Sequence, residues 1–238
     1  MEDFERYGDY NDTEDDAPKR KSPLGLILKI AVAFVCLAVA GVLVFRIILF
    51  NYYPAGMKNI YFDDVLTEYY NSQNGKINAK TQGLRAPYDD ADKGNFFCDN
   101  LIVISGANQL QISVRFNNSL VDAIEKEYGV RIDPKNIEAF KFSLARNPLT
   151  ENDSPTEIGR LDVVNGDSKM MYRYFKLVFN DVDFGLDEGE DSVKWIRLEI
   201  TIDGVDKEEP FMIPIYENNE IYDDFENYKL SSKEVPGK

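Results

Sequence analysis

Acidic side chains have the clearest capacity for chemistry in this sequence, and they gather in two clusters. One cluster lies at residues 89–92 and the other at residues 181–191, and both contain the pattern Asp-x-Asp-x-Gly. Alternate carboxylate oxygens beside a flexible glycine suit Ca²⁺. The candidate calcium ligands are Asp181, Asp183, Asp187 and Glu190. The alternative is a solvated acidic loop, because neither pattern places its glycine where an EF-hand loop requires it.

Carboxylates are also the catalytic groups that remain possible in a chain of this composition. The sequence contains no histidine, which excludes Ser-His-Asp catalysis, Cys-His catalysis and His-ligated zinc. Two carboxylates about 5 to 9.5 Å apart can hydrolyse a glycosidic bond without histidine. A carboxylate-based cell-wall glycosidase is therefore an alternative function. The sequence contains no P-loop and no nucleotide-binding fingerprint.

The single tryptophan is a candidate contact for a ligand or partner. Trp195 shares one strand face with Arg197, Glu199 and Thr201, opposite an apolar row. An aromatic ring on a polar face can bind a sugar or a peptide. The alternative is that a loop or helix of the same domain covers it.

The two cysteines bear on the cellular compartment in which the protein folds. Cys36 lies in an apolar segment and Cys98 in the following domain, so the two are not placed to form a disulfide. Eukaryotic extracellular domains of this size usually carry disulfides, so their absence favours a bacterial envelope protein. Cys98 follows two phenylalanines, which predicts an inert core residue rather than a nucleophile.

The apolar segment Leu24–Phe50 contains only two charged residues, Lys29 and Arg46. The charge-free centre between them gives a helix of roughly 24 Å at about 1.5 Å per residue. That length is shorter than a hydrocarbon core of about 30 Å. The long side chains of Lys29 and Arg46 can reach toward the two interfaces, so that the apolar flanks complete the span. The segment predicts a transmembrane helix at residues 23–50.

Basic residues predict the orientation of this helix. Lys19–Lys21 and Lys29 lie on its N-terminal side, against Arg46 and Lys58 on the other. Because an excess of Lys and Arg stays in the cytoplasm, the N-terminus is expected inside and the following domain outside. The alternative is a signal peptide cleaved after Ala40, which would release the domain. The apolar run continues well past this site, which favours an uncleaved anchor.

The rest of the chain has the periodicity of strands with two short helices. Apolar residues at helical spacing, with Asp63 or Asp64 near the start, predict a helix at Phe62–Tyr70. Ser119 and Asp122 have capping-box spacing at the start of a second helix.

Alternation with a period of two predicts the strands. Residues 110–116 alternate apolar side chains with Gln111, Ser113 and Arg115, which predicts a half-buried strand. The pair Asn165-Gly166 predicts the turn of a hairpin between two further strands. The two strands of this hairpin are predicted at residues 158–164 and 170–179. Other strands are predicted at residues 77–84, 101–105, 140–144, 194–202 and 211–215. The last is expected at an edge because of Pro210 and Pro214.

These patterns predict a mainly β protein: a single N-terminal transmembrane helix followed by an Ig-like antiparallel β-sandwich ectodomain with two short helical insertions. The expected parts are a disordered acidic cytoplasmic tail (1–22), the transmembrane helix (23–50), a juxtamembrane segment with a short amphipathic helix (51–75), the β-sandwich (76–220) and a C-terminal tail (221–238).

Charge and composition narrow the function that we expect. The net charge of −15 repels phosphate backbones, so nucleic acid is not an expected partner. We expect a non-enzymatic binding or scaffold module on the outer face of a bacterial cell membrane. Its partner would be an envelope protein, a peptide or a cell-wall polymer. The alternatives are the glycosidase and a Ca²⁺-dependent adhesion or sensing domain, and no cofactor other than Ca²⁺ is expected.

Overall fold

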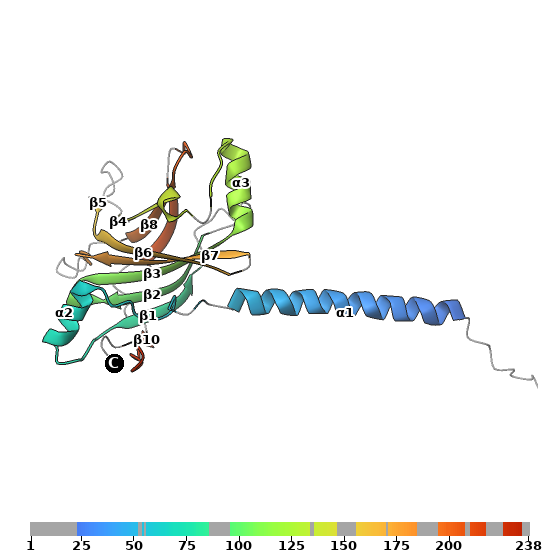
Figure 1. Cartoon of the computed structure of the whole chain (residues 1–238), viewed down its shortest axis with the longest axis horizontal. Helices are drawn as coiled ribbons and strands as arrows, with labels where there is room; N and C mark the ends of the chain where they lie inside the picture. The colour runs from blue at the N-terminus through green and yellow to red at the C-terminus, as the bar shows by residue number, and fades with distance from the viewer. Residues whose placement is uncertain are drawn as a thin grey trace, which may run out of the picture. The chain divides into compact units, whose positions relative to one another are not determined.

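A computed structural model describes residues 23–51, 54, 56–85, 96–133, 136–146, 156–169, 171–184, 195–207, 210–217 and 226–234. The chain divides into two compact units, Met1–Tyr52 and Tyr53–Lys238. In the first unit the described residues form one helix, and in the second they form two sheets and short helices (Figure 1). The acidic tail predicted at residues 1–22 lies outside the described residues.

The helix of the first unit is α1 (Pro23–Asn51). Its segment Gly25–Ile48 is long and apolar enough to cross a membrane, with a mean hydropathy of 2.8. The apolar side chains along it are exposed, including Phe34 and Leu37 at about three quarters of their surface. A helix that is apolar on all sides is typical of a membrane span or the core of a large protein.

The second unit contains two antiparallel sheets, which confirms the prediction of a mainly β protein. The order of the six-stranded sheet is β10-β1-β2-β3-β7-β6, and that of the four-stranded sheet is β5-β4-β8-β9. The strands are β1 (Lys80–Arg85), β2 (Phe97–Ile104), β3 (Gln109–Asn117), β4 (Phe140–Arg146), β5 (Thr156–Glu157), β6 (Arg160–Lys169), β7 (Tyr172–Asn180), β8 (Trp195–Ile202), β9 (Phe211–Glu217) and β10 (Glu226–Asn227). Strand β9 lies at a sheet edge, as its proline predicts.

Both sheets contribute side chains to one main core. Phe116 of β3, Phe140 of β4 and Phe175 of β7 lie with ring centroids 5.3 to 5.6 Å apart. Aromatic rings at this separation stabilise each other beyond the area that they bury. Helix α3 (Asn118–Tyr128), between β3 and β4, adds Leu120 and Ile124 to the same core.

A smaller core lies on the other side of the six-stranded sheet, which we call its outer face. Its buried members are Ile60, Leu66, Ala79, Ile102 and Ile104. Leu66 belongs to α2 (Asp64–Ser72), which forms where the apolar spacing predicts a helix. Tyr69 of α2 packs against Gly106 of the short helix η1 (Ser105–Ala107) so closely that a Cβ there would lie 2.2 Å from the tyrosine oxygen.

The hairpin predicted around Asn165-Gly166 exists, but its turn lies elsewhere. Strand β6 runs through both residues to Lys169, and Met171 lies in a turn just before β7 begins at Tyr172. Neither Asn165 nor Gly166 has the positive φ that a type I′ turn requires. A Cβ on Gly166 would lie 2.9 Å from Ile137, so this glycine provides room for a side chain instead.

Two further predictions are wrong in detail. The cap of α3 is Asn117 rather than Ser119, and the Asn117 side chain accepts a hydrogen bond from the Ser119 backbone N–H. Strand β3 is not half-buried: Gln111, Ser113 and Arg115 are 0%, 1% and 0% exposed. Its polar face is therefore covered, and the covering segment defines the candidate site.

Candidate functional site

A short segment between α1 and α2 crosses the outer face of the six-stranded sheet. We call residues 56–63 the strap. Six polar side chains of β2, β3 and β7 lie beneath or beside it, each less than one-tenth exposed: Asn100, Gln109, Gln111, Ser113, Lys176 and Asn180. We call these six residues the polar row. Buried polar groups are costly without partners, so their hydrogen bonds decide whether the strap can dock.

The strap begins at a turn and is first held at Met57. Gly56 has a φ of 92°, which favours glycine. The Met57 carbonyl accepts a hydrogen bond from the Ser113 hydroxyl and one of 3.5 Å from the Lys176 ammonium. The next carbonyl, that of Lys58, accepts a hydrogen bond of 3.2 Å from Asn100. Two consecutive backbone carbonyls are thus bound by side chains of three neighbouring strands.

Gln111 holds the middle of the strap as a neighbouring strand would. Its Oε1 accepts a hydrogen bond of 2.8 Å from the Tyr61 N–H, and its Nε2 donates one of 2.7 Å to the Tyr61 carbonyl. The second hydrogen of Nε2 is donated to Oε1 of Gln109 at 2.7 Å. A side-chain amide carries the same donor and acceptor as a peptide group, so Gln111 satisfies both backbone groups of Tyr61.

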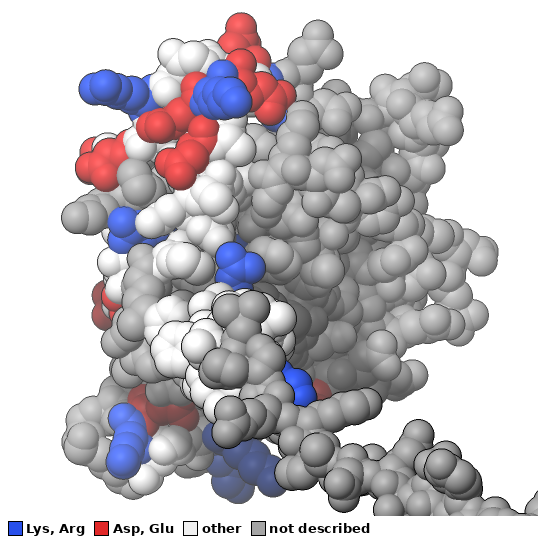
Figure 2. Space-filling model, turned by 90° about the vertical axis from the view of Figure 1, so that its right-hand side faces the viewer, with Lys and Arg blue, Asp and Glu red and all other residues white. Residues whose placement is uncertain are grey.

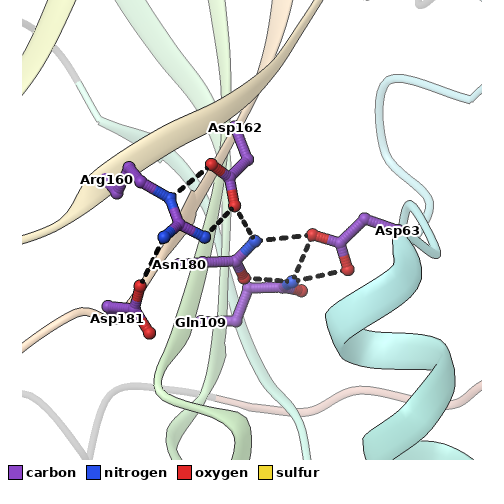
Figure 3. Close-up of polar contacts among 6 residues, drawn as sticks. All are labelled: Asp63, Gln109, Arg160, Asp162, Asn180 and Asp181. Carbon is purple, nitrogen blue, oxygen red and sulfur yellow. Dashed lines mark hydrogen bonds and ion pairs between the residues drawn. The ribbon is translucent and has the colours of Figure 1, made fainter.

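The end of the strap is held by a carboxylate (Figure 3). Asp63 accepts hydrogen bonds from Gln109 at 3.0 and 3.1 Å and from Asn180 at 2.7 Å. It also accepts one of 2.8 Å from the Leu66 N–H as the N-cap of α2. Hydrogen bonds to an ionised acceptor are stronger than those between neutral groups. One side chain thereby fixes both the start of α2 and the end of the strap.

Asn180 links this carboxylate to a second one. Its Nδ2 also donates a hydrogen bond of 2.7 Å to Asp162, and Asp162 pairs with Arg160 at 2.6 Å. Hydrogen bonds from Arg160 and Asn180 lower the pKa of Asp162 to about 2, and the same contact with Asp162 raises the pKa of Arg160. Asp162 therefore stays ionised at neutral pH and lacks the raised pKa of a glycosidase acid.

A buried ion pair lies on the same outer face. The side chains of Arg115 and Asp99 are both 0% exposed, with Nε and Oδ2 3.0 Å apart. The guanidinium lies over the rings of Phe97 and Tyr172, 5.7 and 5.0 Å from their centroids. Cation–π contacts gain strength when they are removed from water. Burial also raises the pKa of the nearby Tyr174 hydroxyl, so it stays neutral.

The described C-terminal residues also contact the strap. Strand β10 pairs with β1, and the hydroxyl of Tyr228 accepts a hydrogen bond of 3.2 Å from the Ile60 N–H. The same hydroxyl donates to Glu234. Burial and the bond to Glu234 raise the pKa of Tyr228, so the donating proton is retained. Part of the predicted C-terminal tail (221–238) thus packs against the domain.

Lys176 differs from the rest of the polar row because it can carry a charge. Burial lowers the pKa of its ammonium to about 7, with an opposing influence from Cys98 and Glu234. The positive charge is therefore disfavoured beneath the strap. At neutral pH this residue is the one member of the polar row whose protonation changes.

Of the candidate calcium ligands, the structure describes Asp181 and Asp183, and these two form separate ion pairs. Asp181 pairs with Arg160 at 3.2 Å, and Asp183 pairs with Arg146 at 3.0 Å. Asp187, Glu190 and the other acidic cluster lie outside the described residues. So does the Trp195 side chain, although its backbone begins β8. Among the residues that the structure describes, no group of three or more His, Cys, Asp or Glu side chains could hold a metal ion.

The outer face of the four-stranded sheet is arranged differently. Lys141 of β4 is 68% exposed, and Arg197 and Glu199 of β8 form an ion pair of 2.7 Å at 20% and 19% exposure. A groove of about 280 Å³ lies nearby, with Lys207 4.9 Å above the ring of Phe211 in its wall. Figure 2 shows another side of the molecule, on which the described acidic and basic side chains lie near one another, so charge of one sign does not mark a binding surface on that side.

Comparison of the chain with protein-family models, curated proteins and solved structures gives no match. The chemistry of the site is therefore judged from its own contacts. The polar row binds three backbone carbonyls and one backbone N–H of the strap, the carboxylates of Asp63 and Asp162 and the hydroxyl of Thr81, all of them in the same chain. These contacts hold the strap on the outer face of the six-stranded sheet.

Proposed function

We propose that this chain is a single-pass membrane protein that displays an Ig-like β-sandwich outside the membrane of a bacterial cell, as a non-enzymatic binding or scaffold module. The observation that carries the proposal is the order in which the apolar helix and the strap follow each other along the chain. An apolar helix fit to span a membrane is followed, after residues 52–55, by a strap held on the domain by buried hydrogen bonds. A helix joined so directly to a folded domain suits an anchor that remains attached.

The two outer faces support the choice of binding surface. Much of the outer face of the six-stranded sheet is occupied by the strap and α2. The outer face of the four-stranded sheet carries accessible polar side chains, including Lys141 and Thr201. We therefore propose that an envelope protein, a peptide or a cell-wall polymer binds at the four-stranded sheet.

Labelling in intact bacteria tests the anchor and its orientation. A cysteine is introduced at Lys141 of the domain in one variant and at Asp12 of the tail in another. Both are treated with a membrane-impermeant maleimide before and after the cells are opened. We expect K141C to react in intact cells and D12C only after opening. Loss of the helix from the mature protein would show cleavage, and labelling of D12C alone would reverse the topology.

Crosslinking tests the binding role. A photo-reactive residue at Thr201 is compared with one at Asp122, on α3. We expect specific crosslinks to an envelope component from Thr201 and few from Asp122. Hydrolysis of a glycan or peptide by the purified chain would overturn the non-enzymatic role.

A further inference from the structure

The strap is joined to the domain differently from the strands of the two sheets. Adjacent strands pair through backbone ladders, whereas Met57, Lys58 and Tyr61 are bound through side chains of the polar row. The main core contains none of the strap residues, and Ile60 belongs to the smaller core. Undocking of the strap would therefore leave the main core and the ladders intact.

Docking of the strap has one unfavourable consequence, which is the burial of the Lys176 ammonium. The Met57 carbonyl covers Lys176, whose side chain is buried on the outer face. Cys98 of β2 and Glu234 of the C-terminal segment are the other titratable groups that act on it. Release of the strap gives the ammonium access to water, which favours its charged form. This gain partly offsets the hydrogen bonds that are lost.

The order of contacts along the chain means that they can open one after another. A pull from the helix arrives at Met57, then at Lys58, then at Ile60 with Tyr228, and then at Tyr61 with Gln111. Asp63 comes last, and it is bound to two polar-row side chains and to the start of α2. Beyond it, Leu66 is fully buried. Opening therefore has a defined end at Asp63.

We propose that residues 56–62 form a releasable latch, which leaves the outer face of the six-stranded sheet while the main core stays folded. Released as an extended chain, these residues lengthen the connection to α1 by up to roughly 25 Å at about 3.5 Å per residue. The use of this length as a spacer rests on the proposed membrane anchor. The latch itself does not, because it depends only on contacts within the second unit.

Hydrogen exchange of the full chain in detergent micelles tests the latch. The Ile60 and Tyr61 amides, bonded to Tyr228 and Gln111, report on the strap. The amides of β3 and β7 report on the main core. We expect the strap amides to exchange at least tenfold faster than those of β3 and β7, with little dependence on added urea, as in a local opening. Equal rates with equal urea dependence would overturn the latch.

A matched pair of variants sharpens the measurement. Ser113→Ala removes a donor to the Met57 carbonyl, and Ile200→Val removes a buried methyl group from the main core without touching the strap. We expect S113A to speed exchange of the strap amides at least fivefold. We expect I200V to speed exchange of the β3 and β7 amides and to leave the strap amides unchanged, because a local opening keeps the main core folded. An equal acceleration of strap and core by I200V would show one cooperative unit. The labelling experiment on topology can fail without altering this result, because micelles impose no orientation.

Discussion

The outer faces of the two sheets have similar sequence patterns but different surroundings. On β3 the polar alternates Gln111 and Ser113 are almost completely buried, whereas on β8 Arg197 and Glu199 keep about a fifth of their surface exposed. The cover on β3 comes from Tyr61, fifty positions away in the chain. Alternation thus indicates which side chains face the main core, while a distant segment decides whether the opposite face meets water.

The strongest contrast is expected between the ion pairs on the two faces. Arg115→Met leaves Asp99 buried without its cation, and removal of one partner from a buried pair costs about 3 to 5 kcal/mol. Arg197→Met breaks a partly exposed pair, for which about 1 kcal/mol or less is expected. Urea unfolding in micelles, followed by the single tryptophan, measures both free energies of unfolding. Equal losses would contradict the difference between the faces.

The second contrast concerns hydrogen bonds to the strap. Gln111→Met removes the partners of the Tyr61 N–H and carbonyl, and we expect the free energy of unfolding to fall by about 2 to 3 kcal/mol. Thr201→Val, at an exposed position of β8, is the control, with an expected change within about 0.5 kcal/mol. The same urea titration compares them. A loss below 1 kcal/mol for Q111M would show that water replaces the side chain.

The third contrast is in the response to pH. The folded-state pKa of Lys176 is lowered to about 7 from 10.5. Between these values only the unfolded chain binds the proton, so stability rises with pH across this window and is lower and constant below it. We expect Lys176 to contribute about 2 kcal/mol of increase between pH 7 and 9. Lys176→Met should lose this increase and Lys141→Met should keep it. Parallel profiles for wild type and K176M would refute the assignment.

The smallest effect is expected for Asp162 on β6, the edge strand of the six-stranded sheet. The pKa of Asp162 is lowered to about 2 from 3.8, so its stabilisation is present above about pH 4 and lost as the pH falls toward 2. Asp162→Asn should therefore move the midpoint of acid unfolding to higher pH. Arg160→Met removes the main cause of the shift and should have a similar effect, with little added in the double variant. Circular dichroism against pH measures the midpoints, and additive shifts would show independent roles.

Most of the secondary structure follows from sequence patterns in physical terms. Helix α2 and strands such as β3 and β8 have unbroken periodicity, and burial of one face supports each of them. The turn after β6 was misplaced because Asn165-Gly166 has a turn signature, whereas Gly166 is required by the nearby Ile137. A steric requirement from another segment has no local signal in the sequence.

The candidate site was harder to predict than the fold. The acidic clusters attracted attention through composition, yet Asp181 and Asp183 form separate ion pairs. The pattern of residues 110–116 predicts that Gln111 and Ser113 face solvent, because they alternate with apolar residues. One feature of the sequence indicates a buried face. The polar residues Gln109, Gln111 and Ser113, which alternate with apolar residues, are uncharged in a chain with 42 acidic residues. Amides and hydroxyls suit burial against a backbone better than carboxylates do.

The contact between Ile60 and Tyr228 bears on how the domain can be produced without its helix. A soluble fragment that begins at α2 would lack the strap and leave the polar row without its acceptors. A fragment that ends before Tyr228 would remove the acceptor of the Ile60 N–H. Both truncations discard residues that look dispensable in the sequence. Expression of residues 53–238 keeps both ends, and aggregation of shorter fragments would reflect lost partners rather than a poorly folding domain.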